Sequence, residues 1–578
     1  MASNQALAGL FETIADILDI QGANVFRVRA YRNAARVISQ LSEPIDEIMA
    51  RDPAALDRLP GIGKGLHDKI AEYCQRGTIT EYEQLKTALP AGLLELLNIP
   101  SLGPKRVKQL YETLGITTVE ALEAAALAGQ LRDLPGMGEK SEAKILKSIR
   151  DYRSLHTGRM QWATADAVLA PYLAYLRGRP GLLQLEPAGS YRRGRETVGD
   201  LDVLATTRGA AADIITAFVT YEDVSDILAQ GDTKASVVLS CGIQVDLRVV
   251  APESFGAALQ YFTGSKEHNV ALRSRAKEFG LKLSEYGVFR EDTAVAGRTE
   301  EDVYAALQLP WIPPELRENR GEIEAAALHT LPCLVELRDI QGDLHMHTTA
   351  SDGALDVRGM INAARARGYR YLAITDHSKA VAIAHGLDDK RLLAQVKEIA
   401  ALRKEFGDMD VFAGIEVDVL RDGSLDISDE VLAQLDFVIA SVHFSTEMSA
   451  AEMTRRMIAA IAHPYVDCIA HPTGRLIGER LPYAVDMNAV IEAARAHHTA
   501  LEINASPHRL DLNEQHADMA RRAGVPLCIN TDAHCAADMD AMRYGVQVAR
   551  RAWCTAEDVL NTWPTAKIRH WRARRRRS

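Results

Sequence analysis

The chain has little of what marks secreted, membrane-embedded or DNA-coating proteins. Its 578 residues include seven scattered cysteines and no CxxC pair, which indicates reduced thiols in a cytoplasmic protein. No apolar run reaches the roughly 18 residues of a membrane span, and the start, MASNQALAGLFETIADIL, is typical of an amphipathic helix rather than a signal peptide. The net charge of −11 argues against a generic basic DNA-coating protein, so any contact with nucleic acid must depend on local geometry.

The composition is that of a soluble globular protein with several domains, since 47% of the residues are hydrophobic and 25% are charged. Five arginines stand among the last seven residues. This segment, 571–578, is either a phosphate contact or a solvated, disordered tail, and the sequence leaves both open.

Two aspartates alternate on an apolar run in GSYRRGRETVGDLDV, residues 189–203. Asp200 and Asp202 are two positions apart, so on a strand they point to the same side. Asp246 lies in VVLSCGIQVDLRVV, where a turn at Cys241-Gly242 separates two predicted strands. Three converging carboxylates repel one another, and two hard cations on oxygen ligands relieve this in phosphoryl transfer. The alternative, a solvated acidic hairpin, is disfavoured by the upstream Gly-Ser and the third aspartate.

This run resembles the nucleotidyltransferase motif of family X DNA polymerases, the polymerase beta-like group. The resemblance implies that Asp200, Asp202 and Asp246 hold two Mg²⁺ ions, which Mn²⁺ could replace, and that Asp246 helps to deprotonate a primer 3′-hydroxyl. Arg248 would orient an aspartate or form an ordinary salt bridge. The residues implied to bind the incoming triphosphate are Ser190, Arg193 and Gly199, with Arg159 as a further phosphate contact.

A second block, YFTGSKEHNVALR at 261–273, resembles the nucleotide pocket of the same family. Tyr261 and Phe262 would stack under the sugar and base, forming a wall that disfavours a 2′-hydroxyl. Thr263, Gly264 and Ser265 would form the turn. Asn269 and Arg273 would face the minor-groove side of the nascent base pair. The resemblance therefore implies deoxynucleoside triphosphates as substrates.

Three segments before residue 150 share a helix, a Gly-rich hairpin and a second helix: LPGIGKGLHDKI at 59–70, IPSLGPKRVKQL at 99–110 and LPGMGEKSEAKI at 134–145. They resemble helix-hairpin-helix motifs, whose glycines let backbone amides point at a phosphate without reading the base sequence. Ser101 departs from the pattern in the second hairpin. The expected DNA-binding residues are Gly61, Gly63, Gly103, Lys105, Gly136 and Gly138.

Lys69 stands where polymerase beta-like proteins carry the lysine that forms a Schiff base with 5′-deoxyribose phosphate. An amine nucleophile needs a depressed pKa, which the neighbouring Lys64 would provide by repulsion; alternatively, Lys69 is a solvated or phosphate-contacting side chain. Arg27, Tyr31 and Arg32 resemble the 5′-phosphate pocket of the family, which supports recognition of a gap more than it supports lyase chemistry.

Residues 343–534 hold 12 of the 17 histidines. Apolar runs end one after another in a potential ligand, as in YLAITDH, VFAGIE and FVIASVH, and polar helical stretches separate these runs. Strands alternating with helices, with functional residues at the strand ends, predict a TIM-like barrel with its site on one face.

This pattern resembles the PHP family, the polymerase and histidinol phosphatase group, and all nine metal-ligand positions are filled. By this resemblance, His345, His347, Glu416 and Asp532 would hold one ion. Glu416 would bridge to a second ion held by His443 and His471, and Asp352, His377 and His534 would hold a third. Ligands without thiolates suit Mn²⁺, Zn²⁺ or iron. Such a cluster hydrolyses phosphoesters.

The expected fold is multidomain: a helical helix-hairpin-helix amino-terminal region, an α+β nucleotidyltransferase palm and a TIM-like α/β barrel. The expected boundaries are 1–82 for a lyase-type domain, 83–155 for a helical fingers-type region, 156–250 for the palm, 251–316 for a nucleotide-binding thumb-type subdomain, 317–337 for a stiff linker that starts in the Pro-rich LPWIPPELRENRG, 338–570 for the barrel and 571–578 for the basic tail.

The resemblance implies a monomeric, nucleoid-associated DNA polymerase that fills short gaps or nicks in base-excision repair, with a 3′-5′ exonuclease in the barrel. Cleavage at abasic sites, removal of 3′-phosphates and the lyase step are further activities open to these sites. Two alternatives are a polymerase with a structural, non-hydrolytic barrel and a DNA-end binding scaffold. The full ligand set argues against the first, and the three aspartates argue against the second.

Overall fold

The computed structural model describes residues 4–39, 45–51, 56, 62–90, 92–99, 102–155 and 158–576. The chain divides into two compact units at Thr157–Gly158. In these described ranges, no helix has the length and apolar character needed to cross a bilayer.

The first unit is built of helices around two apolar cores. In α1, Leu7, Phe11, Ile14 and Leu18 recur at helical spacing and are buried together. The predicted boundary after residue 82 falls inside α5, whose Leu85 packs on the first core. The helices are α1 (Asn4–Ile20), α2 (Val25–Ser39), α3 (Ile45–Arg51), α4 (Lys64–Arg76), α5 (Thr80–Thr87), α6 (Leu93–Leu97), α7 (Pro104–Leu114), α8 (Val119–Leu127) and α9 (Glu139–Leu155).

The three hairpins open onto helices at the expected glycines. Helices α4, α7 and α9 begin directly after Gly63, Gly103 and Gly138, and a Cβ at any of the three would meet no atom within 4 Å. Gly136 has φ +76°, the left-handed conformation that glycine tolerates best. Gly61 and Ser101 lie outside the described residues. Open space before a helix amino terminus is what a phosphate contact requires.

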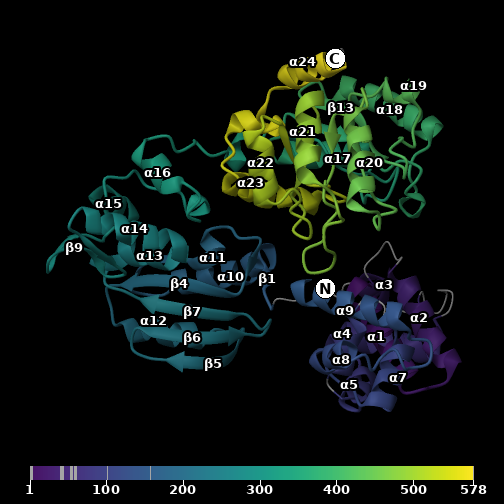
Figure 1. Cartoon of the computed structure of the whole chain (residues 1–578), viewed down its shortest axis with the longest axis horizontal. Coiled ribbons are helices and arrows are strands. Elements are labelled where there is room, and N and C mark those ends of the chain that lie inside the picture. The colour runs from purple at the N-terminus through teal and green to yellow at the C-terminus, as the bar shows by residue number, and fades with distance from the viewer. Residues whose placement is uncertain are drawn as a thin grey trace. The chain divides into compact units, whose positions relative to one another are not determined.

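The second unit begins with a five-stranded sheet in the order β2-β4-β7-β6-β5 (Figure 1). Its strands are β2 (Leu182–Pro187), β4 (Asp200–Thr207), β5 (Val224–Gln230), β6 (Lys234–Leu239) and β7 (Gln244–Val249). Strands β4 and β7 are parallel, and the other pairs are antiparallel. Helices α10 (Trp162–Arg177) and α12 (Ala211–Val219) pack with the sheet. Gly242 makes the predicted β6–β7 turn with φ +88°. Short elements β1 (Met160–Gln161), α11 (Gly189–Arg192) and β3 (Thr197–Val198) complete the palm.

The thumb-type subdomain contains α13 (Phe255–Thr263), α14 (Lys266–Glu278), β8 (Lys282–Ser284), β9 (Gly287–Arg290), β10 (Thr293–Ala296), α15 (Glu300–Ala306) and α16 (Glu322–Ala327). The expected linker 317–337 is wrong. Ile323, Ala326 and Leu334 are buried in the same core as Leu272 and Val303. The prolines stiffen the chain, but apolar side chains beyond them fold it back onto the thumb.

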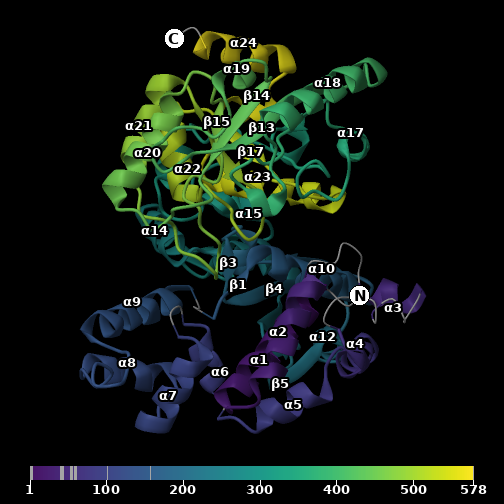
Figure 2. The ribbon, with the colours of Figure 1, turned by 90° about the vertical axis from the view of Figure 1, so that its right-hand side faces the viewer.

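Seven parallel strands follow in sequential order, β11 to β17, inside a layer of helices (Figure 2). The segments that follow the first and last strands meet through a parallel bridge between Met346 and Ala533, which nearly closes the predicted barrel of seven strands. Its strands are β11 (Gly342–Asp343), β12 (Tyr371–Ile374), β13 (Asp410–Asp418), β14 (Phe437–Ser441), β15 (Cys468–Ile469), β16 (Ala500–Asn504) and β17 (Leu527–Asn530). Its helices are α17 (Val357–Ala366), α18 (Asp389–Glu405), α19 (Asp429–Leu432), α20 (Ala450–Ala462), α21 (Met487–His497), α22 (Glu514–Arg522), α23 (Met542–Arg551) and α24 (Thr565–Arg575).

The arginine-rich end is part of the barrel up to residue 576, so a tail starting at residue 571 is wrong. Helix α24 runs to Arg575, and Arg572 donates to Asp467 at 2.9 Å. Arg575 is buried and donates to the carbonyl oxygens of Ile461, His463 and Pro464 at 2.8 to 3.1 Å. The guanidinium of Arg575 thus satisfies backbone carbonyl groups at the carboxyl end of α20. The high arginine content of this segment did not reveal that contact.

Replacing Arg575 with methionine should therefore lower the free energy of unfolding by about 2–3 kcal/mol, because buried carbonyls lose charged donors. Chemical denaturation of the full chain measures this change. Arg574→Met, at an exposed position on the same helix, is the matched control and should leave stability unchanged. Equal stability of both variants would contradict a structural role for Arg575.

Candidate functional site

The three palm carboxylates lie on two adjacent parallel strands. Asp202 on β4 is paired with Asp246 on β7, and Asp200 is two residues before Asp202 on the same side. Burial, followed by the charges of Asp200 and Asp246, raises the pKa of Asp202 to about 6. Gln244 donates to Oδ2 of Asp246 at 3.1 Å. This crowding of hard oxygen donors fits divalent cations.

Gly189 explains why the Gly-Ser turn precedes the aspartates. Its φ is +63°, and a Cβ there would lie 2.6 Å from Oδ2 of Asp202. A side chain at this position would therefore push against the carboxylate. The turn brings α11, which starts at Gly189, directly to the acidic side of the sheet.

An open pocket of about 780 Å³ joins this acidic edge to the thumb. Unpredicted members include Arg195, Lys266 and Glu318. Gly199 and Arg248 do not line it, although Gly199 lies against the guanidinium of Arg159. The predicted residues that line the pocket are Arg159, Ser190, Arg193, Asp200, Asp202, Tyr261, Phe262, Gly264, Ser265, Asn269 and Arg273.

Arg248 takes neither form of contact that the sequence suggested. Its guanidinium carbon lies 4.5 Å from the centre of the Phe262 ring, a cation–π stack. Within the described part of the chain, Arg248 makes no ion pair. Its charge still opposes the rise in the pKa of Asp202. Arg248 thus supports the aromatic wall and acts on Asp202 at longer range.

Buried polar contacts join the thumb to the palm. Arg192 donates to both carboxylate oxygens of Glu300 at 2.7 and 2.8 Å, and the fully buried Arg317 donates to the same group. Asn269 donates to the carbonyl of Tyr261 at 2.7 Å, which orients the aromatic wall. Glu300 and Arg317 were not predicted, because nothing in the sequence pattern marks a charge as buried.

The expected lyase pocket contains an unexpected carboxylate. Glu81 forms ion pairs with Lys69 and Arg27 and accepts a hydrogen bond from Tyr31 at 2.7 Å. Burial raises the pKa of Glu81, but its three partners lower it below the ordinary value overall. Arg32 instead pairs with Asp16 and Asp19 at 3.0 and 3.1 Å, apart from this cluster. Lys69 is therefore held in an ion pair with a carboxylate that the sequence did not reveal.

All nine predicted barrel ligands gather at the carboxyl ends of the strands. Glu416 on β13 is the centre: its oxygens lie 2.6 Å from His377, 3.1 Å from His471 and 3.4 Å from His443. It also lies 3.7 and 3.8 Å from His345 and His347. A second carboxylate, Asp532, lies 3.0 Å from His347.

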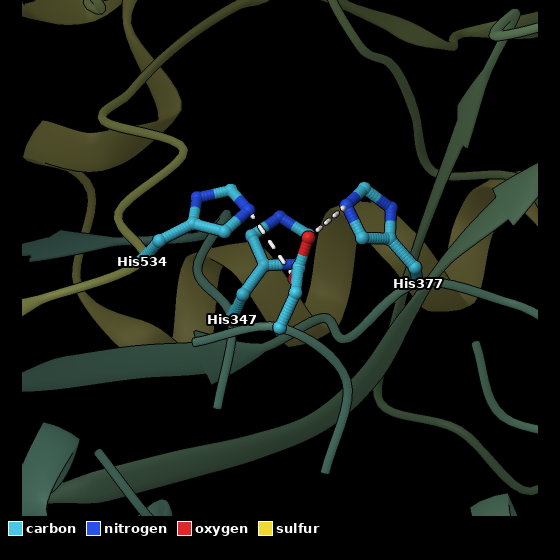
Figure 3. A group of neighbouring side chains, drawn as sticks. His347, His377 and His534 are labelled. Atoms are coloured by element: carbon cyan, nitrogen blue, oxygen red, sulfur yellow. Dashed lines mark ion pairs between the residues drawn. The ribbon is translucent and has the colours of Figure 1, made fainter. Parts of the chain in front are cut away.

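The groupings differ in detail from the expected three sets. His347 belongs with Asp352, His377 and His534 as well as with His345 and Asp532. His377 also joins Glu416 and His443. Figure 3 shows His347, His377 and His534 around a common space, and Asp352 lies 3.6 Å from His377 and 3.4 Å from His534. The ligand sets therefore overlap, as expected of a cluster rather than three separate sites.

Unsatisfied atoms in the cluster fit metal ions. Nε2 of His345, Nδ1 of His347 and Nδ1 of His471 are buried without a hydrogen-bond partner. Burying such groups without a partner is costly. Divalent cations would satisfy these atoms, and imidazoles with carboxylates suit Mn²⁺, Zn²⁺ or iron.

Residues behind the ligands hold the imidazoles in place. Glu502 on β16 lies 2.8 Å from Nδ1 of His345, which leaves Nε2 to face the cluster. Asp418 lies 3.0 Å from Nδ1 of His443. Such carboxylate–histidine pairs orient ligands and raise their basicity. Neither carboxylate was predicted, although the acidic residue in the apolar strand ALEIN was a usable signal.

The histidines of the cluster have pKa values that are shifted in opposite directions. Burial lowers the pKa of His345, but Asp532, Glu502 and Glu416 raise it well above the ordinary value overall. Burial and the neighbouring His534 and His377 instead lower the pKa of His347 to about 4. Opposite shifts within one group of ligands indicate strong electrostatic coupling, which is typical of functional sites.

Arg509 brings a positive charge to the edge of the cluster. Its Nε lies 3.8 Å from Oδ2 of Asp532, and its Nη1 is buried without a hydrogen-bond partner. Its charge contributes, after burial, to the lowered pKa of His471. A guanidinium beside the ligands suits a phosphate-containing substrate.

Four family models match the chain. A helix-hairpin-helix domain matches residues 2–79, and a SAM-like helix-hairpin-helix tandem matches 93–151. The DNA polymerase beta thumb matches 258–318, and the PHP domain matches 343–504. The thumb match extends past residue 316, in agreement with the buried position of Arg317.

Curated relatives match either nearly all of the chain or about half of it. DNA polymerase/3′-5′ exonuclease PolX of Bacillus subtilis (strain 168) is 41% identical over 560 residues, which cover 96% of each chain. DNA polymerase lambda of Rattus norvegicus is 26% identical over 53% of this chain and 55% of its own. A probable phosphatase of Thermoanaerobacter sp. (strain X514) is 29% identical over 41% of this chain and 95% of its own. The chain belongs to the family X DNA polymerases of the bacterial type, with a carboxy-terminal PHP domain.

Proposed function

We propose that this protein extends primers in short gaps of DNA during base-excision repair and removes nucleotides from 3′ ends with its barrel. The observation that carries the proposal is the pairing of Asp202 with Asp246 beside a pocket lined by Arg193, Tyr261 and Phe262. Gapped or nicked duplex DNA and deoxynucleoside triphosphates are the proposed substrates of a monomer acting at the nucleoid.

The palm residues would divide the work of nucleotide addition. Asp200, Asp202 and Asp246 would hold two Mg²⁺ ions, which stabilise charge on the attacking and leaving oxygens. Asp246 would also accept the proton of the primer 3′-hydroxyl. Ser190 and Arg193 would bind the triphosphate, with Arg159 as a further contact, and the Tyr261–Phe262 wall would select the deoxyribose.

The barrel residues would hold the substrate for hydrolysis. The nine ligands would hold a cluster of Mn²⁺ or Zn²⁺, which polarises a phosphoester when bound. Arg509 would contact the scissile phosphate from the side of Asp532. The partnerless ring nitrogens of His345 and His347 argue against a purely structural barrel, and the crowded palm carboxylates argue against a passive scaffold.

A gapped duplex with a labelled primer tests both activities of the full chain. Magnesium with deoxynucleoside triphosphates should give extension by the length of the gap. Manganese without nucleotides should give a ladder of primers shortened from the 3′ end. Failure to extend in either metal would remove the polymerase assignment, and internal or 5′ cleavage would remove the exonuclease assignment.

Lyase chemistry at Lys69 is a second proposal, limited by Glu81. A Schiff base forms from the neutral amine, whereas the Glu81 carboxylate pairs with the ammonium form. Glu81→Gln should therefore increase borohydride trapping on a 5′-deoxyribose phosphate substrate about fivefold. This factor corresponds to the loss of about 1 kcal/mol, the upper range for an ion pair that is partly exposed.

Two variants complete this experiment. Glu83→Gln, at an exposed position of the same helix, is the control and should trap like the original protein. Lys69→Ala should abolish trapping, and undiminished adduct in that variant would assign the nucleophile to another residue.

A further inference from the structure

One arginine of the barrel reaches the nucleotide pocket of the palm. Arg551, the last residue of α23, is 1% exposed. Its Nη1 donates to the carbonyl of Arg193 at 2.6 Å, and its Nη2 donates to Glu318 at 3.0 Å. Arg193 and Glu318 both line the pocket that also contains Asp200 and Asp202. A residue more than 350 positions away in sequence thus contacts the proposed triphosphate site.

Glu318 stands between two arginines. Nε of Arg193 donates to Oε1 of Glu318 at 3.1 Å, and Nη2 of Arg551 donates to the same oxygen. Burial raises the pKa of Glu318, but Arg551 and then Arg193 lower it below the ordinary value overall. The carboxylate is therefore ionised at the wall of a pocket meant for a polyanion. The guanidinium of Arg551, on the barrel, balances the negative charge of Glu318.

The barrel holds Arg551 firmly in this position. Glu514 on α22 accepts from its Nη2 at 2.7 Å and also accepts from its Nε. The contact is close, since a Cβ on Gly194, which follows Arg193, would overlap the side chain of Gln547 on α23. The palm turn and α23 therefore fit together without room for a side chain between them.

We propose that Arg551 is a positioning residue of the nucleotide pocket. It holds Arg193 in place by donating to the carbonyl of that residue, and it neutralises the charge of Glu318. The guanidinium of Arg193 therefore remains available to the triphosphate. This inference rests on the proposed binding of the triphosphate by Arg193. This role of Arg551 would make the barrel a structural part of the nucleotide-addition site. A barrel variant should then alter nucleotide binding while hydrolysis in the barrel continues.

Steady-state primer extension by the full chain tests this role. Arg551→Met should raise the KM for the deoxynucleoside triphosphate about tenfold, because a buried charged contact is lost and Glu318 is left unbalanced. The kcat should stay within about twofold, because no metal ligand moves. Adding Glu318→Gln to Arg551→Met should restore most of the affinity, since it removes the unbalanced carboxylate.

The chain offers a matched control one residue away. Arg550 donates to Glu315 of the thumb at 2.8 Å, an ion pair of the same kind that does not reach Arg193. Arg550→Met should leave the KM unchanged. Equal KM values in Arg551→Met and Arg550→Met would overturn the inference, and so would a lack of rescue by Glu318→Gln.

Two further measurements separate the possible failures. If Arg193→Met leaves the KM unchanged, the proposed triphosphate role of Arg193 fails; if Arg193 matters and Arg551 does not, only the positioning role fails. Manganese-dependent degradation and the melting temperature report folding. Should Arg551→Met unfold the barrel, Arg551→Lys replaces it: the ammonium cannot serve all its acceptors, so the KM should rise about threefold, and an unchanged KM would refute the role.

Discussion

Replacing Asp202 with asparagine should abolish primer extension in magnesium, with a loss of at least about 10³-fold, while degradation in manganese continues. Asp202 is the central carboxylate of the palm, because its pairing partner across the parallel strands is Asp246 and its sequence neighbour on the same side is Asp200. Metal-ion stabilisation supplies several kcal/mol to a displacement at phosphorus, and each 1.4 kcal/mol is tenfold in rate. Single-turnover extension of a gapped duplex measures the loss.

The control for this variant is Asp226→Asn on β5, which changes the same chemical group on the same sheet at an exposed position. It should extend primers normally. Extension by Asp202→Asn within tenfold of the original protein would remove the palm carboxylates from the reaction. Loss of degradation as well would indicate that the unit had unfolded.

Replacing Glu416 with glutamine should have the opposite effect. Among the described residues, Glu416 is the only carboxylate that lies within 4.0 Å of all five of these histidines: His345, His347, His377, His443 and His471. An amide keeps the shape but removes the charge that would bridge ions. We expect degradation in manganese to fall by at least about 10²-fold, because bridging ligands set both affinity and position of the ions, and extension in magnesium to remain.

Metal content gives a readout independent of activity. Glu416→Gln should retain fewer ions after dialysis against manganese or zinc. Glu430→Gln, at an exposed position on α19, should keep the full complement and full degradation. Full metal content together with full degradation in Glu416→Gln would contradict the assignment of the barrel as a hydrolytic site.

Local patterns predicted the strands that carry the sites. Asp200 and Asp202 alternate on β4, and the apolar runs before His377 and His443 are β12 and β14. In each case a short stretch determines both the element and the direction of its side chains, so periodicity was sufficient. The nearly closed ring of seven strands agrees with the expected TIM-like barrel, because the strands after β11 are apolar runs followed by helices.

Contacts between distant segments were not predictable in this way. Glu81 faces Lys69, Glu502 orients His345, and Glu318 joins Arg193 to the barrel. Each is an acidic residue whose partner lies on another element, and sequence spacing says nothing about which elements meet. The linker and the tail were wrong for a related reason: charge and proline content suggested exposure, whereas tertiary packing buries Arg317 and Arg575.

The closure of the barrel determines when a nuclease site can exist. His347 follows β11 and Asp532 follows β17, so their contact joins segments 185 residues apart at the seam of the ring. During synthesis, the palm strands with all three aspartates emerge long before β17, and domains fold largely as they emerge. A ribosome-bound chain could therefore bring its three palm aspartates together while the site that removes nucleotides, and the contact of Arg551 with the nucleotide pocket, are still unbuilt.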